Sequence, residues 1–295
     1  SLHSGNREEP VFRKEKKQKI IIEVRTLQQL QSVSVSDLVE RVCLDSDMLT
    51  PECMDKIIEA TGKLHDSGMD IYIKFPHVCR QKTIKILSDK RALIERLSPD
   101  GLCVGNLESL GYIKNNYPDF KLMTDCGFYI FNKETASVLK QQGISEHNLA
   151  YELHRKEIMQ LVKDAPSHDF YLPVYGYIPV METAGCLLKT NNACRNGSGT
   201  ECVSLIDRHK KERLVITHCD RCENTIYNSV PLSLHNEKKH MKDLGTSGII
   251  LKFTTEQEEC VKKILAYWSN VMKDLPETDY PLNDFTKGHF AKGVE

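Results

Sequence analysis

Short apolar segments alternate with amphipathic helical segments along most of the chain, and this alternation limits the folds that the chain can adopt. Eight segments are predicted strands: 19–26, 41–47, 70–76, 101–106, 121–126, 148–153, 169–176 and 248–254. Nearly all are followed by a predicted helix, and the clearest helix carries an apolar stripe from Cys260 to Met272. Eight such units within 295 residues predict an α/β protein, a (β/α)8 TIM-like barrel. A doubly wound open sheet is the alternative, but no glycine-rich phosphate loop follows the first strand.

The alternation stops for about seventy residues between the seventh and eighth predicted strands. We therefore expect one barrel domain over residues 17–295, carrying an insert at 180–245. Residues 1–16 are polar and form a predicted lead-in. Because the chain lacks an initiator Met, we expect it to be the C-terminal piece of a longer protein, whose remaining N-terminal part is then a partner.

In barrels of this type, chemistry takes place where the strands end and the following loops begin. Polar side chains at or near those positions are therefore the candidate site residues. The catalytic candidates are the carboxylates of Asp125 and Glu152. The substrate-binding candidates are Arg25, Asp45, Lys74 and Asn106.

The insert contains two pairs of cysteines, Cys186 with Cys194 and Cys219 with Cys222. The second pair forms a C-x-x-C turn, which can direct two sulfurs at one metal ion. Four thiolates suit zinc or an iron–sulfur cluster, and the wide spacing of the first pair is unusual for a zinc ribbon. We therefore expect a four-iron four-sulfur cluster, with zinc as the alternative; Cys202 lies between the pairs and could replace Cys194 as a ligand.

The remaining cysteines bear on the core of the protein and on its cellular compartment. Cys43, Cys103 and Cys126 lie in apolar strand segments, where we expect small buried side chains. An odd count of eleven cysteines and the absence of an export signal favour the reducing cytoplasm. No apolar run is long enough to cross a membrane.

The formal net charge of the chain is −1, but the insert is locally basic. Between residues 186 and 222, seven Lys and Arg residues oppose four Asp and Glu residues. A basic patch of this kind can contact the phosphates of RNA, although it can also be a solvated loop.

Three segments carry a resemblance to a known family: VYGYIPVMETAGCLLKT, YNSVPLSL and TKGHFAKGVE. Together they resemble the collagenase-like peptidase family U32, and more narrowly the C-terminal half of its long bacterial members. The segment YELHRKEI, residues 151–158, is similar to the family's S-P-E-L-x-x-x-E-I motif, which implies that Glu152 is the family's strand-end glutamate. The chain departs from that motif at Ala150 and Tyr151, where the family has serine and proline.

The resemblance also implies chemistry. Members are named as peptidases, whereas well-characterised relatives hydroxylate RNA pyrimidines or the ubiquinone ring, with prephenate or molecular oxygen and a cluster held by four cysteines. The family has a cysteine seven residues before the position of Cys186, where this chain has Pro179. A cluster here would therefore use Cys194 as the replacement ligand.

The resulting hypothesis is a barrel that supports iron–sulfur-dependent hydroxylation of an RNA pyrimidine, with prephenate as a further cofactor. One alternative is a collagenase-like peptidase, and another is a non-catalytic binding module stabilised by zinc. The sequence leaves open whether this part of the protein is itself the enzyme.

Overall fold

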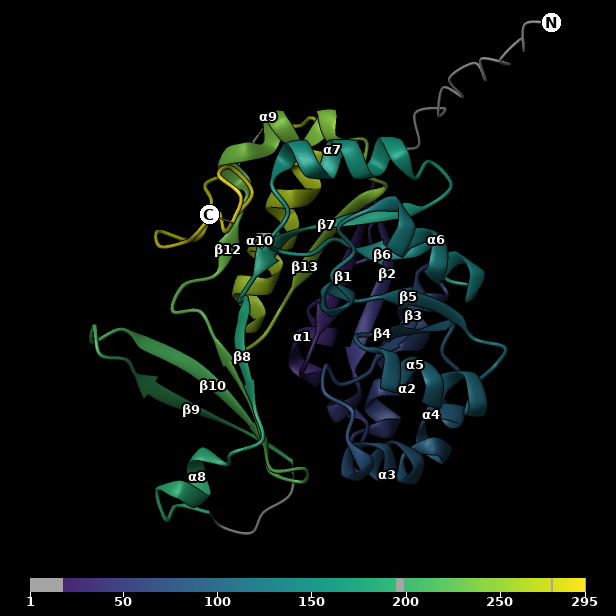
Figure 1. Cartoon of the computed structure of the whole chain (residues 1–295), viewed down its shortest axis with the longest axis vertical. Helices are drawn as coiled ribbons and strands as arrows, with labels where there is room; N and C mark the ends of the chain where they lie inside the picture. Colours follow the sequence, from purple (N-terminus) through teal and green to yellow (C-terminus); the bar gives the residue numbers. More distant parts are fainter. Residues whose placement is uncertain (1–17, 195–198, 277, 295) are drawn as a thin grey trace, which may run out of the picture.

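The structure, a computed structural model, describes residues 18–194, 199–276 and 278–294 (Figure 1). The predicted lead-in, residues 1–16, lies outside the described residues. Eight parallel strands form the barrel: β1 Lys19–Val24, β2 Val39–Asp45, β3 Asp70–Lys74, β4 Gly101–Val104, β5 Lys121–Thr124, β6 Glu146–Asn148, β7 Asp169–Gly176 and β13 Gly248–Lys252. The predicted (β/α)8 barrel is confirmed.

Pairing of β6 with β7 closes the sheet, because the other neighbours run in the order β7, β13, β1, β2, β3, β4, β5, β6. Seven predicted strands coincide with observed ones to within a few residues. The sixth is displaced: β6 ends at Asn148, and the apolar residues that suggested a strand lie in the turn that follows. Leu149 and Leu153 are apolar because they pack into the core from this turn.

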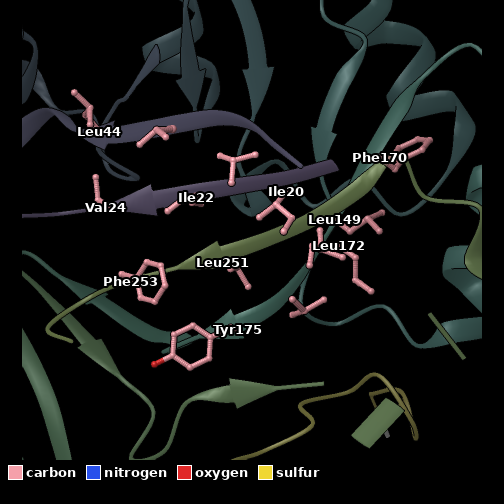
Figure 2. Packing of buried hydrophobic residues seen from close by; sticks show 14 of the residues in the cluster. Ile20, Ile22, Val24, Leu44, Leu149, Phe170, Leu172, Tyr175, Leu251 and Phe253 are labelled. Atoms are coloured by element: carbon pink, nitrogen blue, oxygen red, sulfur yellow. The ribbon is translucent and has the colours of Figure 1, made fainter. Parts of the chain in front are cut away.

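Helices surround the barrel and cover the outward side chains of its strands. They are α1 Leu27–Gln31, α2 Met54–His65, α3 Gln81–Asp89, α4 Arg91–Leu97, α5 Leu107–Asn116, α6 Lys133–Gln141, α7 Arg155–Asp164 and α10 Glu258–Met272. Outward side chains such as Ile20, Ile22 and Leu251 join the large core cluster between strands and helices (Figure 2). This burial removes apolar surface from water and is the main stabilising contribution to the barrel.

The inward side chains form a second, smaller cluster inside the barrel. Tyr72 is fully buried there, and the guanidinium of Arg41 stacks 3.9 Å from the centre of its ring. Gly101 on the neighbouring β4 makes room for that ring, since a Cβ at this position would lie 2.4 Å from Cζ of Tyr72. The predicted burial of Cys43, Cys103 and Cys126 is confirmed.

The insert leaves the C-terminal end of β7 and forms its own antiparallel sheet, in the order β8, β11, β10, β9. Its elements are β8 Pro179–Thr183, α8 Leu187–Thr190, β9 Thr200–Ile206, β10 Glu212–His218 and β11 Glu223–Tyr227. Strands β9 and β10 form a hairpin that projects away from the barrel, whereas β8 runs closer to the barrel (Figure 1). Strand β11 pairs with β10 on one side and with β8 on the other.

The chain then returns to the barrel through short elements. These are β12 Leu232–Ser233, the 3-10 turns η3 His235–Glu237 and η4 Lys242–Leu244, and α9 Lys238–Met241. Strand β12 pairs antiparallel with Tyr175 and Gly176 at the end of β7. The three-residue β6 pairs only with the first residues of β7, from Asp169 to Tyr171. The C-terminal segment packs on this region, where Thr286 bridges to Leu232 and Phe290 is buried.

Candidate functional site at the barrel mouth

One cavity of about 380 Å³ lies at the C-terminal ends of the strands, between the barrel and the insert. Five of the six predicted site residues line it: Arg25, Asp45, Lys74, Asp125 and Glu152. Four of them end a barrel strand or directly follow one, as a barrel active site requires. Glu152 reaches the cavity from the turn after β6.

Asn106 is the predicted site residue that does not line this cavity. Its side-chain oxygen accepts a hydrogen bond from the backbone N–H of Ser109 at 2.7 Å and so caps α5. Its amide nitrogen donates to the backbone oxygen of Pro76 at 3.4 Å. These contacts give Asn106 a structural role that fixes the start of α5.

The sequence interpretation missed two buried charges of the mouth, Glu23 on β1 and Lys252 on β13. Both lie in otherwise apolar strand segments, KIIIEV and GIILK. Burying a charge in a strand is costly unless the charge is paired. The presence of Glu23 and Lys252 in these strands therefore indicated that each has a buried partner of opposite charge. The insert supplies further lining residues from β8, β10 and β11, none of which was among the predicted site residues: Glu182, His218, Thr225 and Tyr227.

Glu23, Lys74, Asp125 and Lys252 form a closed ring of alternating charges, here called the ion quartet. Lys74 Nζ lies 2.7 Å from Glu23 Oε2 and 2.9 Å from Asp125 Oδ2. Lys252 Nζ lies 3.1 Å from Glu23 Oε1 and 2.6 Å from Asp125 Oδ1. The Asn148 amide also donates to Glu23 at 3.3 Å and to Asp125 at 3.2 Å. All four charges are therefore compensated within the ring.

The pKa shifts follow from this arrangement. Burial alone would raise the pKa of Asp125, but Lys252 and Lys74 hold it well below its ordinary value. Burial alone would lower the pKa of both lysines, but Asp125 and Glu23 hold them well above theirs. Lys252 is thus an ammonium rather than a nucleophilic amine, and Asp125 is a carboxylate that pairs with both lysines.

Polar contacts of Arg25 and Asp47 attach the insert to the barrel at this mouth. Arg25 bridges Asp45 of β2, with Nε to Oδ2 at 3.1 Å, and donates to the hydroxyl of Tyr227 on β11 at 2.7 Å. Asp47, in the 3-10 turn η1 Ser46–Met48, accepts two hydrogen bonds from Arg221 at 2.8 and 3.1 Å. Burial alone would raise the pKa of Asp47, but His218 and Arg221 hold it well below its ordinary value.

The predicted metal ligands do not assemble in the described part of the chain. Cys186 caps α8, its Sγ accepting from the backbone N–H of Lys189 at 3.4 Å. Cys219 contacts the hydroxyl of Thr217 at 3.6 Å, and Cys222 lies 3.8 Å from Lys82 Nζ.

Cys194, like the alternative ligand Cys202, is exposed. Across 18–194, 199–276 and 278–294, no three His, Cys, Asp or Glu side chains converge as metal ligands would. The described thiols are thus not assembled around one point, and the four-cysteine cluster and the zinc alternative stay predictions.

Cys126 is the cysteine that lines the mouth cavity. Burial raises the pKa of its thiol to about 12, and its Sγ lies 3.4 Å from Lys252 Nζ. The thiolate is the reactive form of cysteine, so this side chain is a poor nucleophile near neutral pH.

The family model of peptidase family U32 matches residues 49–287. The chain belongs to peptidase family U32. The family resemblance expected from the sequence is thereby confirmed, and the mouth cavity is a feature of a U32 barrel. No curated protein matches the sequence of this U32 chain.

Solved structures similar to this U32 barrel include one described as a U32 peptidase, with 10% identity and a TM-score of 0.49 over 86% of this chain and 100% of the other. A chitinase from Rhizomucor miehei is 11% identical, with a TM-score of 0.43 over 87% of this chain and 99% of the other. An N-acetylneuraminate lyase from Mycoplasma synoviae is 9% identical, with a TM-score of 0.42 over 88% and 78%.

Within the described residues, no helix combines the length and the apolar character needed to span a membrane.

Proposed function

We propose that this U32 barrel binds single-stranded RNA and receives one unpaired pyrimidine base in its mouth cavity, as part of a protein that hydroxylates RNA pyrimidines. The observation that carries the proposal is an aromatic pair at the rim of the cavity. Tyr129 lines the cavity and is 50% exposed, and Phe131 beside it is 46% exposed. Their rings are nearly parallel, with centroids 6.2 Å apart and an interplanar angle of 21°.

Exposed, stacked aromatic rings beside a cavity suit RNA because every unpaired base has a flat face that can stack on them. The cavity of about 380 Å³ falls in the range of small-ligand sites. Its lining carries four Lys and Arg side chains against six Asp and Glu side chains. This excess of negative charge favours a neutral base over an anionic ligand such as prephenate.

The phosphates need a separate, basic surface, and the insert hairpin offers one. Arg208, Lys210 and Lys211 are exposed at its tip. The acidic residue of the turn, Asp207, does not neutralise these three cations. It accepts a hydrogen bond from the backbone N–H of Lys211 and pairs with Arg213 at 3.1 Å. The tip therefore presents three cations, while β8 and β11 of the same sheet border the mouth. Arg195, also counted in the basic insert, lies outside the described residues.

The proposal does not extend to the hydroxylation step itself, since no three metal-ligating side chains converge among the described residues. The proposed function therefore concerns what this chain's own residues do: Tyr129 and Phe131 stack the bases, the cavity encloses one base, and the hairpin tip holds phosphates. A peptidase mechanism would need an activated nucleophile at the mouth, and Cys126, with its raised pKa, does not supply one.

The test is binding of a fluorescein-labelled single-stranded pyrimidine RNA, followed by fluorescence anisotropy. Tyr129→Ala removes the stacking ring and is expected to cost about 1–3 kcal/mol, or roughly 5- to 150-fold in Kd. Tyr129→Phe is the matched control and keeps wild-type affinity, because it retains the ring. The absence of saturable RNA binding, or equal binding by Tyr129→Ala and the wild type, would refute the proposal.

A further inference from the structure

A second basic surface lies at the start of α3, and it is separate from the hairpin tip. It consists of Arg80, Lys82 and Lys85, here called the α3 surface, and all three side chains are exposed. None of the ion pairs among the described residues includes any of the three. The first turn of α3 also contains no acidic residue. The α3 surface is therefore a patch of positive charge with no acidic partner in the described part of the chain.

The stability of α3 does not account for these cations. The backbone dipoles of a helix favour acidic side chains in its first turn and basic side chains in its last turn. The helices α5, α6, α7 and α10 follow this rule, since each has a glutamate in its first turn. Arg80 and Lys82 lie at the end of α3 where positive charge is unfavourable. Their position favours a role in binding an anion over a role in folding.

The α3 surface borders the mouth cavity from two directions. The loop that leads into α3 lines the cavity from Phe75 to Val78, and the helix begins three residues later. On the insert side, Lys82 Nζ lies 3.8 Å from Sγ of Cys222. The residues on either side of Cys222, Arg221 and Glu223, line the same cavity.

The acidic residues of the neighbouring insert turn do not neutralise the α3 surface. Asp220 and Glu223 both pair with Arg221, at 3.8 and 3.0 Å. The α3 surface thus keeps its positive charge at the rim of the cavity, as the hairpin tip does at its own position.

Strand β10 separates the two basic surfaces. It begins at Glu212, next to the hairpin tip, and ends at His218, directly before the turn that contacts Lys82. At about 3.4 Å per residue, its seven residues span about 24 Å. The adjacent β11 lines the cavity between these ends, from Tyr227 on the side of the tip to Glu223 on the side of the turn. The hairpin tip and α3 accordingly lie well apart (Figure 1).

We propose that the α3 surface binds RNA phosphates on the opposite side of the cavity from the hairpin tip, so that one strand crosses the mouth between two phosphate anchors. A base inside a strand has a phosphate on each side of it, and phosphate contacts fix the position of the strand while contacts to the base select it. Anchors on both sides therefore hold the unpaired pyrimidine over the cavity. This inference rests on the proposed function and adds the path of the strand.

The first test is the salt dependence of binding of a fluorescein-labelled pyrimidine RNA of about 12 nucleotides, a length within the range of single-strand sites. The triple variant Arg80→Gln, Lys82→Gln and Lys85→Gln should reduce the slope of log affinity against log salt by about 2, at about 0.7 per phosphate contact. Its urea midpoint, followed through the buried Trp268, should stay at or above that of the wild type.

The matched control removes three exposed lysines from the far face of the barrel. Lys114, Lys140 and Lys163 lie in the last turns of α5, α6 and α7, which run antiparallel to the strands and so end away from the mouth. Their replacement by glutamine makes the same change in net charge and should leave the slope unchanged. An equal loss of slope in both triple variants would contradict the inference, because it would show only an effect of net charge.

The second test is photo-cross-linking with 4-thiouridine at either end of the same RNA, followed by peptide mass spectrometry. One end should cross-link to peptides of the hairpin tip and the other end to peptides of α3. Cross-links of both ends to the hairpin tip alone would overturn the proposed path. If Tyr129→Ala weakens binding but the α3 variant keeps the wild-type slope, the proposed function stands and the second anchor is refuted. If the wild type shows no saturable RNA binding, both fail.

Discussion

Removal of one charge from the ion quartet is expected to destabilise the barrel strongly, and removal of an opposite pair much less. Lys252→Met leaves the carboxylates of Glu23 and Asp125 sharing the single cation of Lys74. Lys252 and Glu23 are each less than a tenth exposed, so the surplus charge stays buried. Breaking a buried ion pair on one side typically costs about 3–5 kcal/mol. We expect about 3 kcal/mol here, because Lys74 still contacts both carboxylates.

Asp125→Asn creates the opposite imbalance, with two ammonium groups on Glu23 alone, and we expect a cost of about 3–5 kcal/mol. The double variant Lys252→Met with Asp125→Asn restores neutrality, because the Glu23–Lys74 pair at 2.7 Å remains. Groups in direct contact typically couple by about 0.5–3 kcal/mol. The double variant should therefore be about 2 kcal/mol more stable than the sum of the single variants implies.

Urea unfolding can measure this coupling through Trp268, which is the sole tryptophan of the chain and is fully buried. Lys63→Met is the matched control: its partner Glu59 is one helical turn away, both side chains are about 70% exposed, and stability should hardly change. Strict additivity of the two quartet substitutions would refute the reasoning, because it would show that the four charges do not interact as a closed ring.

Three further predictions concern the hairpin, a buried histidine and the cysteines. Replacement of Arg208, Lys210 and Lys211 by glutamine should reduce the slope of log affinity for single-stranded RNA against log salt by about 2, at about 0.7 per phosphate contact; anisotropy titrations between 50 and 200 mM salt measure it. Burial lowers the pKa of His147 to about 3, so the unfolded chain alone gains this proton below about pH 6.5. The free energy of unfolding should therefore fall by up to about 1.4 kcal/mol per pH unit from pH 6.5 towards 3, and His147→Gln should lose that share of the slope in urea titrations at several pH values. Iodoacetamide at neutral pH should modify the exposed Cys222 much faster than Cys126, as peptide mass spectrometry would show.

The barrel was predictable because its signal is local and repeated. Each buried strand has a run of apolar residues, and each helix has apolar residues at a spacing near 3.6. The one displaced strand shows the limit of that signal, since Leu149 and Leu153 are buried without belonging to a strand. Burial can be predicted from apolar character, but the backbone conformation that achieves it depends on neighbours distant in the sequence.

The mouth was only partly predictable for a related reason. The strand-end rule found Arg25, Lys74 and Asp125, because the ends of parallel strands meet at one edge of the barrel. It could not find Asn106's role as a helix cap, which depends on the backbone of Ser109. The family-like segments contain Glu182 and Tyr227, but they do not place these residues at the cavity, since an antiparallel sheet brings Glu182 opposite Thr225 only through its strand register.

The cysteines show why spacing alone is weak evidence for a shared site. A C-x-x-C turn constrains only its own two thiols, and the other pair must be brought to it by the fold. Here the fold brings Cys186 and the Cys219–Cys222 turn to the same end of the insert sheet, because Thr183 pairs with Asn224 and the Asn224 amide donates to the backbone oxygen of Gly185 at 2.8 Å. Even so, no three metal-ligating side chains of the described residues converge there. The charges that do converge on the mouth, Glu23 and Lys252, come from strands paired side by side in the barrel. Sheet pairing fixes positions across long stretches of sequence, so it is the paired strands, rather than the cysteine motif, that build the site.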